Sequence, residues 1–522
     1  MPGAFRHVKM VDGTTVKAFI HGDEFFNYET DENEFLLTPN DKGFYVNTRR
    51  RISAEEVQQR RAAARRAAGV TDEPRRIVGH PMTPPRILVV LVQYQDVKFR
   101  PENTKSEWED FFSKEGYDYK GSPGSVRDYF IAQSGGKYKP EFDVVGPVTV
   151  ANNQAYYGDT HGTYQAYEAV TEACVLLDNE VDFSQYDTNG DGEIDFVFML
   201  YAGEGAANGS DDAIWPHHSG WRHDWSPEEK EEKCLKLDGK YLTMYACGNE
   251  WNVQAGHRDG VGTACHEISH NLGLPDYYDT KEIGTKRLPG HWNLMGSGSW
   301  NNEGITPCNW SIYDKYYLGW ETPHNLSKAG VTYVLKPSSE GWWVTKSGKL
   351  SGATDAETVY YLENRQKQGW DEYLPGHGLV IWQVNYDQNA WGGNRPNSTL
   401  GEEERMTIVS SSNIVGDNKP FPGPYGKTSV TLGVDAITNI EEDAEGNISF
   451  KKNDPEAVDL QLELFYNKKQ YDVFDFKINN YDEPLDFRVK LPYKDDWKSE
   501  LQYACYRFGR QEAFSTIATD MM

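Results

Sequence analysis

The sequence predicts an α+β fold, with a mixed α/β domain in the middle of the chain, a small β segment before it and β-sandwich-like domains after it. The chain has 522 residues, too many for one ordinary core, so several domains are expected. Strand-like and helix-like stretches alternate from about Pro84 to Trp320, which favours a mixed α/β domain. Strand-like segments dominate beyond that point, which indicates β domains.

The first part of the chain predicts a small β unit followed by a charged linker. Residues 1–48 alternate short strand-like pieces with turns, and this segment is too small to be stable alone, so we expect it to pack on something larger. Residues 49–83 hold nine arginines, and Ser53 followed by Glu56 fits a helical capping box. Two interpretations stay open: an exposed charged helix, or a processing region whose paired arginines suit a trypsin-like protease.

Three further domains are expected. The apolar run PPRILVVLVQYQD has the pattern of a buried strand and begins a mixed α/β domain over residues 84–325. The segments TVYYLEN and HGLVIWQVNYD belong to a β domain over residues 326–454. Residues 455–522 begin with a stretch that alternates with period two, which predicts a further small β module, complete or not.

Composition excludes several classes of partner. The formal net charge of −27 repels phosphate groups and anionic lipid, so nucleic acid is not an expected partner. No run of 18 apolar residues exists, and we expect no transmembrane segment.

The opening MPGAFRHVKMVDG lacks an apolar core, so no signal peptide is expected in the chain as it starts here. Six cysteines without a CxxC pair do not predict a disulfide scaffold.

The stretch CHEISHNLGLPDYYD predicts a zinc site. His266 and His270 are four residues apart and share one face of a helix, so both imidazoles can reach one ion. Glu267 projects beside them, where it can accept a proton from metal-bound water. The pattern alone also occurs in ordinary surface helices. The residues that follow it favour the zinc interpretation.

A tight turn returns the chain towards this helix. Gly273 stands where the helix must end in the left-handed conformation, and Pro275 cannot continue it. Asp276 then completes the pattern H-E-x-x-H-x-x-G-x-x-D, whose last position resembles the third ligand of metzincins. Asp279 is the alternative third ligand. Further on, Met295 in HWNLMGSGSW lies 25 residues past His270 and resembles the metzincin Met-turn.

The segment DTNGDGEID predicts a calcium loop. Oxygen-bearing side chains alternate along it, and a glycine stands at the bend, as in the first part of an EF-hand loop. Phe198 occupies the position of the bidentate glutamate, so a complete EF-hand is excluded. A polar turn without calcium is the alternative. The candidate ligands are Asp187, Asn189, Asp191, Glu193 and Asp195.

Together, these features resemble the immune inhibitor A family of secreted zinc metallopeptidases. The motifs HEISHNLGLPDYYD, WNLMGSGSW and DTNGDGEIDFVFMLYAGEG carry the resemblance, with support from LENRQKQGWDEYLPGHGLVIWQVNYD and GDEFF. The resemblance implies a metzincin-like catalytic domain made as a zymogen and acting outside the cell or at its surface. It also implies that His266, His270 and Asp276 bind zinc, that Glu267 is the catalytic base, that Met295 is the turn methionine, and that residues 187–195 bind calcium.

The expected reaction is hydrolysis of internal peptide bonds in protein or peptide substrates. We expect the substrate to lie along an edge strand, for which YLTMYACGNEW is the candidate. Tyr313, Tyr316 and Tyr317 are candidate oxyanion donors, although SIYDKYYLGW also fits a packed helix. Two rival functions are a zinc hydrolase of cell-wall or glycoprotein bonds and a non-catalytic binding protein that uses metal for stability.

Latency is a further expectation. We expect residues 1–48 to fold over the cleft and a cut within 49–76 by an activating protease to release them. The segment has no cysteine, which excludes a cysteine switch in this part of the chain. Asp23 or Glu24 is the candidate cap for the zinc ion.

Overall fold

The computed structural model describes 22 stretches of the chain, and the remaining residues are left out of the description. Contacts divide the chain into two compact units, and the first comprises residues 1–326, 334–427 and 442–448. The described residues are 5–22, 26–40, 42–53, 56–57, 59–60, 86–158, 165–210, 212–220, 226–280, 288–326, 328–337, 341–346, 358–398, 404–412, 414, 416–432, 435–453, 461–466, 469–471, 485–490, 500–507 and 510–518. Asp23 and Glu24 lie outside them, as does most of the arginine-rich linker.

A five-stranded antiparallel sheet forms at the start of the chain, in the order β1-β2-β3-β4-β5. Its strands are β1 (Phe5–Lys9), β2 (Thr15–Gly22), β3 (Asn27–Thr30), β4 (Leu36–Pro39) and β5 (Tyr45–Asn47). At the start of the linker, the Ser53 hydroxyl accepts a 3.1 Å hydrogen bond from the Glu56 N–H, as the capping box predicts.

The central sheet positions the candidate metal centre. Its order is β10-β13-β9-β6-β7, with β14 added beside β13. The four strands β13, β9, β6 and β7 are parallel, whereas β10 at the edge is antiparallel to β13. Its strands are β6 (Arg86–Gln93), β7 (Glu141–Thr149), β9 (Val197–Glu204), β10 (His217–Gly220), β13 (Met244–Asn252) and β14 (His257–Arg258).

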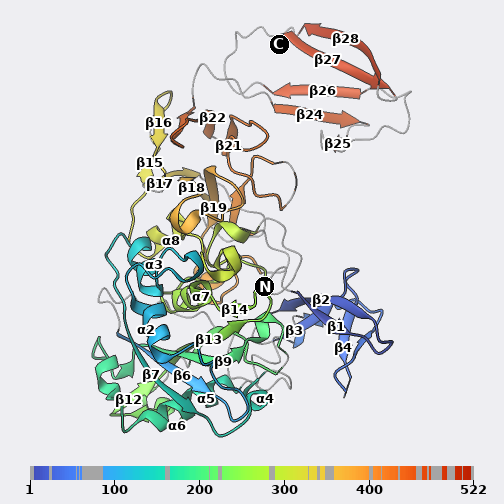
Figure 1. Ribbon diagram of the computed structural model, residues 1–522. Helices are drawn as coiled ribbons and strands as arrows, with labels where there is room; N and C mark the ends of the chain where they lie inside the picture. The colour runs from blue at the N-terminus through green and yellow to red at the C-terminus, as the bar shows by residue number, and fades with distance from the viewer. Residues whose placement is uncertain are drawn as a thin grey trace. The chain divides into compact units, whose positions relative to one another are not determined.

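Helices cover both faces of this sheet (Figure 1). Alternation along β6 sends Ile87, Val89 and Leu91 into a core with α2, α3 and α7. Leu88, Val90 and Val92 enter a second core with α5 on the opposite face. The helices are α2 (Lys105–Ser113), α3 (Val126–Gln133), α4 (Gln154–Tyr157), α5 (Ala166–Leu177), α6 (Pro227–Lys233), α7 (Val261–Asn271), α8 (Ile312–Tyr317) and α9 (Gln388–Gly392).

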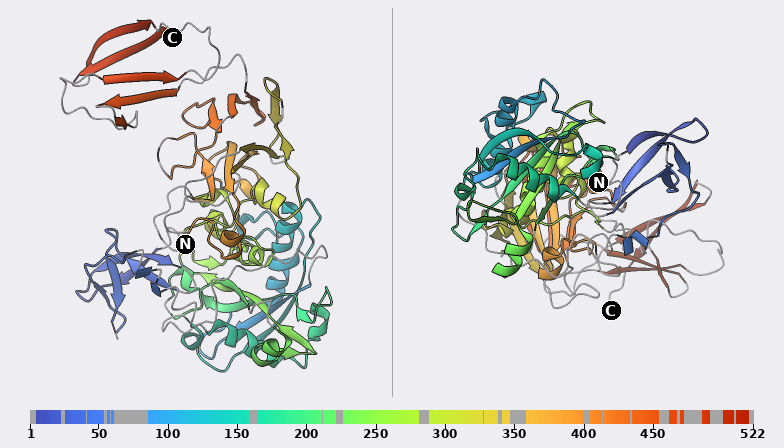
Figure 2. Two further views of the ribbon diagram at one scale, coloured as in Figure 1. Left: turned by 180° about the vertical axis from the view of Figure 1, so that it is seen from behind. Right: turned by 90° about the horizontal axis from the view of Figure 1, so that it is seen from below.

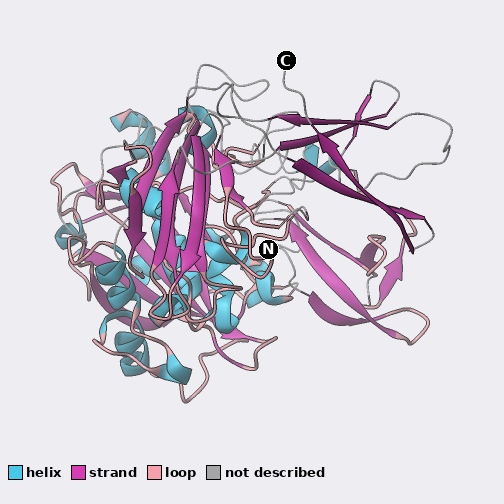
Figure 3. Cartoon of the chain, turned by 90° about the horizontal axis from the view of Figure 1, so that it is seen from above, coloured by secondary structure: helices cyan, strands magenta, loops and turns pink. Residues whose placement is uncertain are grey.

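Two further sheets and several 3₁₀ turns complete the mixed α+β arrangement of the first unit (Figure 3). A small sheet has the order β11-β12-β8, and another has the order β15-β17-β18-β19-β20. These strands are β8 (Glu193–Ile194), β11 (Lys236–Leu237), β12 (Lys240–Leu242), β15 (His324–Asn325), β17 (Gly341–Lys346), β18 (Thr358–Arg365), β19 (Gly378–Asn385) and β20 (Met406–Val409). The 3₁₀ turns are η1 (Tyr119–Gly121), η2 (Phe183–Tyr186), η3 (Ala206–Asn208), η4 (Gly290–Trp292), η5 (Gly298–Gly304) and η6 (Gly369–Asp371).

One hydrophobic core joins residues on both sides of position 325. Cys265 and Ile268 of α7 belong to the same buried cluster as Tyr361 of β18, Trp382 of β19 and Trp391 of α9. The segment around the zinc motif therefore shares its interior with strands that begin more than 30 residues after that position.

The second unit comprises residues 327–333, 428–441 and 449–522 and is built from strands. It holds most of a sheet ordered β16-β23-β22-β21, a sheet ordered β25-β24-β26, and the hairpin β27-β28 (Figure 2). Its strands are β16 (Thr332–Leu335), β21 (Val430–Leu432), β22 (Asp435–Glu442), β23 (Ile448–Lys452), β24 (Gln461–Tyr466), β25 (Lys469–Tyr471), β26 (Leu485–Lys490), β27 (Glu500–Arg507) and β28 (Arg510–Ala518).

Candidate metal centre

Helix α7 carries the two histidines and is packed unusually closely against the turn η5. A Cβ atom on Gly262 would lie 2.0 Å from the Ser299 carbonyl oxygen, and one on Gly260 would lie 2.1 Å from the Gly304 carbonyl. Only glycine permits this approach of two backbones. The helix is thus fixed against the segment that follows Met295.

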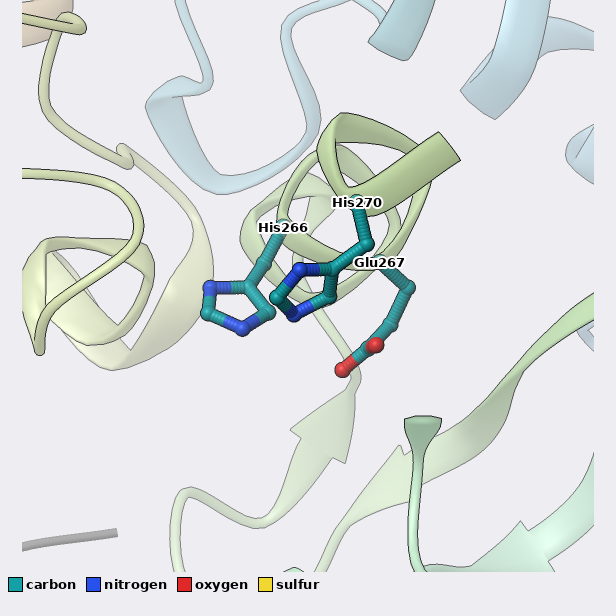
Figure 4. A group of neighbouring side chains, drawn as sticks. All are labelled: His266, Glu267 and His270. Carbon is teal, nitrogen blue, oxygen red and sulfur yellow. The ribbon is translucent and has the colours of Figure 1, made fainter. Parts of the chain in front are cut away.

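Three side chains of α7 converge on one point (Figure 4). The ligand atoms of His266, Glu267 and His270 all lie within 4.8 Å of one another. His266 Nδ1 is 3.0 Å from the Leu294 carbonyl oxygen, and His270 Nδ1 is 2.7 Å from that of Leu274. Each carbonyl accepts a hydrogen bond from the Nδ1–H group, which leaves the lone pair of each Nε2 for a metal.

The turn after α7 brings Asp276 to the two histidines. Gly273 has a φ of 94°, the left-handed conformation that the sequence predicts there. Asp276 Oδ1 lies 3.1 Å from His266 Nε2 and 3.3 Å from His270 Nε2. Donor atoms arranged tetrahedrally about 2.0 to 2.1 Å from a zinc ion are about 3.3 Å apart, so this donor set fits zinc. Asp279 is half-buried.

The electrostatics of the site favour a cation between these groups. Burial alone would raise the pKa of Asp276, but His270 and His266 hold it well below its usual value. Burial opposes the charge on His266, yet its hydrogen bond to Asp276 and the charge of Glu267 raise its pKa to about 9. Burial also raises the pKa of Glu267. Asp276 therefore stays ionised in the buried site, where its negative charge suits a cation.

The turn that contains Met295 is bonded to the loop that follows α7. Met295 is fully buried, and its carbonyl oxygen accepts a 2.8 Å hydrogen bond from the Tyr277 N–H. The buried carboxylate of Asp314 accepts hydrogen bonds from the Tyr277 hydroxyl at 2.7 Å and from Asn293 Nδ2 at 2.6 Å. One carboxylate thus ties the loop that holds Asp276 and Tyr277, the candidate third-ligand loop, to the methionine turn.

The edge strand next to the site is β10. The expectation that YLTMYACGNEW forms this edge is wrong, because its strand β13 is paired on both sides, with β10 and β9. The N–H of His218 in β10 donates a hydrogen bond to the Glu267 carboxylate. The antiparallel edge therefore runs beside the candidate base.

The three candidate tyrosines all lie on helix α8. Tyr313 is 3% exposed and packs its ring against Tyr361 and Trp391, as the packed-helix interpretation predicts. Tyr316 is 48% exposed. An oxyanion role for any of them stays a prediction.

The candidate calcium loop is closed by its own hydrogen bonds in its first half. The Asp187 carboxylate accepts from the N–H groups of Asp191 and Gly192, both at 3.0 Å, and from Lys240 Nζ at 2.6 Å. Asn189 Oδ1 accepts from the Asp191 N–H at 2.8 Å. These oxygens face the inside of the loop, where a cation would compete with Lys240.

In the second half of the loop, the Glu193 carboxylate bonds to residues outside the loop, whereas the Asp195 carboxylate bonds within it. The Glu193 carboxylate forms an ion pair with Lys230 and accepts a 2.6 Å hydrogen bond from the Thr243 hydroxyl. Asp195 Oδ2 accepts from the Thr188 N–H at 3.1 Å. Calcium binding here stays a prediction.

Sequence reasoning missed Asn394. Its Nδ2 donates a 2.7 Å hydrogen bond to Asp276 Oδ2, and its Oδ1 accepts a 2.6 Å hydrogen bond from the Asp276 N–H. The two residues are 118 positions apart, and no motif in the sequence links them.

Comparison with known proteins identifies the middle of the chain. Residues 83–323 match the family model described as "Immune inhibitor A peptidase M6, catalytic domain". Immune inhibitor A of Bacillus thuringiensis subsp. alesti is 30% identical over 280 residues, covering 45% of this chain and 39% of that protein. The pre-pro-metalloprotease PrtV of Vibrio cholerae is 28% identical over 275 residues, covering 45% of this chain and 29% of that protein.

The resemblance inferred from the zinc motif is thereby confirmed. The matched region spans well under half the length of these curated relatives. None of the helices within the described ranges is long and apolar enough to cross a membrane.

Proposed function

Because residues 83–323 carry an M6-family metallopeptidase catalytic domain, we propose that the chain is a zinc-dependent endopeptidase. His266, His270 and Asp276 bind the zinc ion, Glu267 is the general base, and Met295 supports the site from below. The observation that carries the proposal is the spacing of the three donor atoms, with Asp276 Oδ1 at 3.1 and 3.3 Å from the two Nε2 atoms. The same spacing supports Asp276 as the third ligand.

The residues around the site suit peptide hydrolysis. Bound zinc supplies a Lewis acid that polarises the scissile carbonyl and acidifies a water molecule. Glu267 takes a proton from the attacking water and passes it to the leaving amine. Its burial raises its pKa, which makes the protonated state that the second transfer needs more accessible. The His218 N–H holds the carboxylate in place.

The substrate chain lies along β10. This strand has β13 on one side, and its other side is the edge of the sheet. An extended peptide can add to such an edge through main-chain hydrogen bonds, which suits a protease that accepts internal segments of protein chains. His218 joins this edge to Glu267, so a peptide bound there lies next to the base.

The N-terminal sheet acts as an inhibitory segment. Ile20 of β2 packs in one buried cluster with Ala207 and Trp215, and Trp300 lies against it. Trp215 precedes the edge strand β10, and Trp300 follows the methionine turn, so the sheet contacts the rim of the site. The relative PrtV is named a pre-pro-metalloprotease, which supports synthesis of this chain as a precursor.

An activating protease releases this segment by cutting within residues 49–76, and the mature enzyme works outside the cell or at its surface. Incubation with trypsin tests the latency. Casein hydrolysis should rise as the cut appears, and unchanged activity after complete cleavage there would rule out inhibition by residues 1–48.

Calcium binds the loop 187–195. The inward-facing oxygens of Asp187 and Asn189 support this proposal, and the positive φ angles of 76° at Gly190 and 89° at Gly192 give the loop its tight bend. Added calcium should raise the thermal unfolding temperature of the wild type. It should leave Asp187→Ala unchanged.

The deciding experiment combines metal analysis with a casein assay. Glu267→Gln keeps the volume of the buried side chain, so it should retain one zinc per chain and lose proteolysis. His270→Ala should lose both. A zinc hydrolase of other bonds would leave casein intact while cleaving mucin or peptidoglycan, and a binding protein would keep its function in Glu267→Gln.

A further inference from the structure

The carboxylate of Asp276 is held from outside the matched catalytic segment. Asn394 follows helix α9 and meets Asp276 through both halves of its side-chain amide, the oxygen at 2.6 Å and the nitrogen at 2.7 Å. We propose that Asn394 is a positioning residue for the third metal ligand, which makes the segment after position 325 part of the catalytic machinery. This inference rests on the proposed function of the site.

The two carboxylate oxygens of Asp276 have different partners. Oδ2 accepts from Asn394, and Oδ1 faces His266 and His270. Because the Asp276 N–H is held by the same amide, neither the main chain nor the carboxylate can turn without breaking a bond. Asp276 is thus set in the geometry that the metal requires before the metal arrives.

A neutral amide is chemically suited to this task. Lysine or arginine would offer a stronger bond to Asp276, but it would place a second positive charge beside the metal ion. The amide of Asn394 orients the carboxylate and leaves its full negative charge for the cation. Asn394 therefore tunes the position of the ligand without neutralising it.

The backbone conformation at Asn394 fixes the direction of this side chain. Its φ of 53° is left-handed, a conformation that asparagine tolerates better than most residues. Its N–H donates a 3.1 Å hydrogen bond to the carbonyl of Trp391, whose ring is 3% exposed in the core. The end of α9 is thus anchored, and the position of Asn394 follows from that anchor.

Two residues after Asn394 also form hydrogen bonds to the loop that holds Asp276. Asn397 Nδ2 donates a 2.9 Å hydrogen bond to the Tyr277 carbonyl, and the Ser398 hydroxyl accepts a 2.8 Å hydrogen bond from the Thr280 N–H. These bonds reach only the backbone of the third-ligand loop. Asn394 is the member of this set that also reaches a metal-binding carboxylate.

Asn394→Gly provides the test, because glycine keeps the left-handed backbone and removes both bonds to Asp276. Loss of a residue that orients a metal ligand weakens metal binding about 10- to 100-fold, and we expect that loss in zinc affinity measured by competition with a chelator. The visible spectrum of the cobalt-substituted full chain should also change, since it reports the geometry of the ligands.

Asn389→Gly is the matched control. Asn389 is exposed on α9, the helix that precedes Asn394, so this change weakens α9 without touching Asp276. It should leave zinc affinity and the cobalt spectrum as in the wild type. Asn394→Asp, which fills the same space and lacks the amide donor, replaces the glycine variant if that variant does not fold. Its cobalt spectrum should likewise differ from that of the wild type.

The possible results separate this inference from the proposed function. A folded Asn394→Gly with a zinc affinity within about twofold of the wild type and an unchanged cobalt spectrum would overturn the role of Asn394. An unchanged spectrum in a folded Asn394→Asp would do the same. If the wild type itself binds no zinc and cleaves no casein, the proposed function fails instead.

Discussion

The buried ion pair of Arg365 with Asp371 allows a quantitative test of how strongly the β segment is joined to the catalytic segment. Their side chains are 3% and 0% exposed, and they meet through two hydrogen bonds of 2.6 Å each. Arg365 also donates to the carbonyl oxygens of Trp292 and Asn309, each at 3.2 Å, and to Glu363 at 3.1 Å. Arg365→Met removes every one of these bonds and leaves a buried carboxylate without its cation.

Breaking a buried ion pair from one side costs about 3–5 kcal/mol, so Arg365→Met should lower the free energy of unfolding by that amount. Asp371→Leu leaves the charge of Arg365 partly compensated by Glu363, but it also removes the acceptor of the Asn309 N–H, which costs about 1–3 kcal/mol. The double variant buries no unpaired guanidinium. Its loss should therefore be smaller than the sum of the two single losses.

Urea unfolding followed by tryptophan fluorescence measures these differences. Lys114→Met is the control, because it breaks an exposed pair with Asp110 and should leave the urea midpoint unchanged. The reasoning is refuted if Arg365→Met costs less than about 1 kcal/mol, or if the double variant equals the sum of the single variants within about 0.5 kcal/mol.

Three other changes have defined outcomes. Gly262→Ala places a methyl group 2.0 Å from the Ser299 carbonyl, and thermal unfolding should show a loss of about 1–3 kcal/mol or more. Burial lowers the pKa of His217 from 6.5 to about 4, because the buried ring resists protonation. The stabilisation from the neutral ring is fully present above pH 6.5, and the free energy of unfolding falls as the pH falls from 6.5 towards 4. That loss is about 3 kcal/mol, and urea midpoints of His217→Gln should fall less over this pH range. Asp276→Ala should lose zinc on dialysis and Asp279→Ala should keep it; the opposite metal contents would make Asp279 the third ligand.

The sequence predicts the parts of the site that depend on local spacing. The helical period brings His266 and His270 to one face, and Gly273 with Pro275 returns Asp276 to it, since each of these effects acts within a few residues. The apolar run of β6 is likewise a local pattern, and this strand occurs where it is predicted.

Other features depend on partners that are distant in the sequence. β10 has four residues, HHSG, and so short a strand has no alternation by which an edge can be recognised. The apolar YLTMYACGNEW reads as a strand, but its pattern does not say which strands lie beside it. Asn394 is one of many asparagines in loops, and only the folded chain shows that it meets Asp276.

The separation of Asp276 and Asn394 along the chain also determines how long after Asp276 the ribosome adds Asn394. A ribosome adds roughly 5–20 residues per second, so the 118 positions between them take about 6–24 s to synthesise. His266, His270 and Asp276 leave the ribosome during that interval without the amide that orients the last of them. The proposed ligands and the proposed base therefore emerge well before Asn394, and the synthesis of the chain itself delays completion of the proposed site.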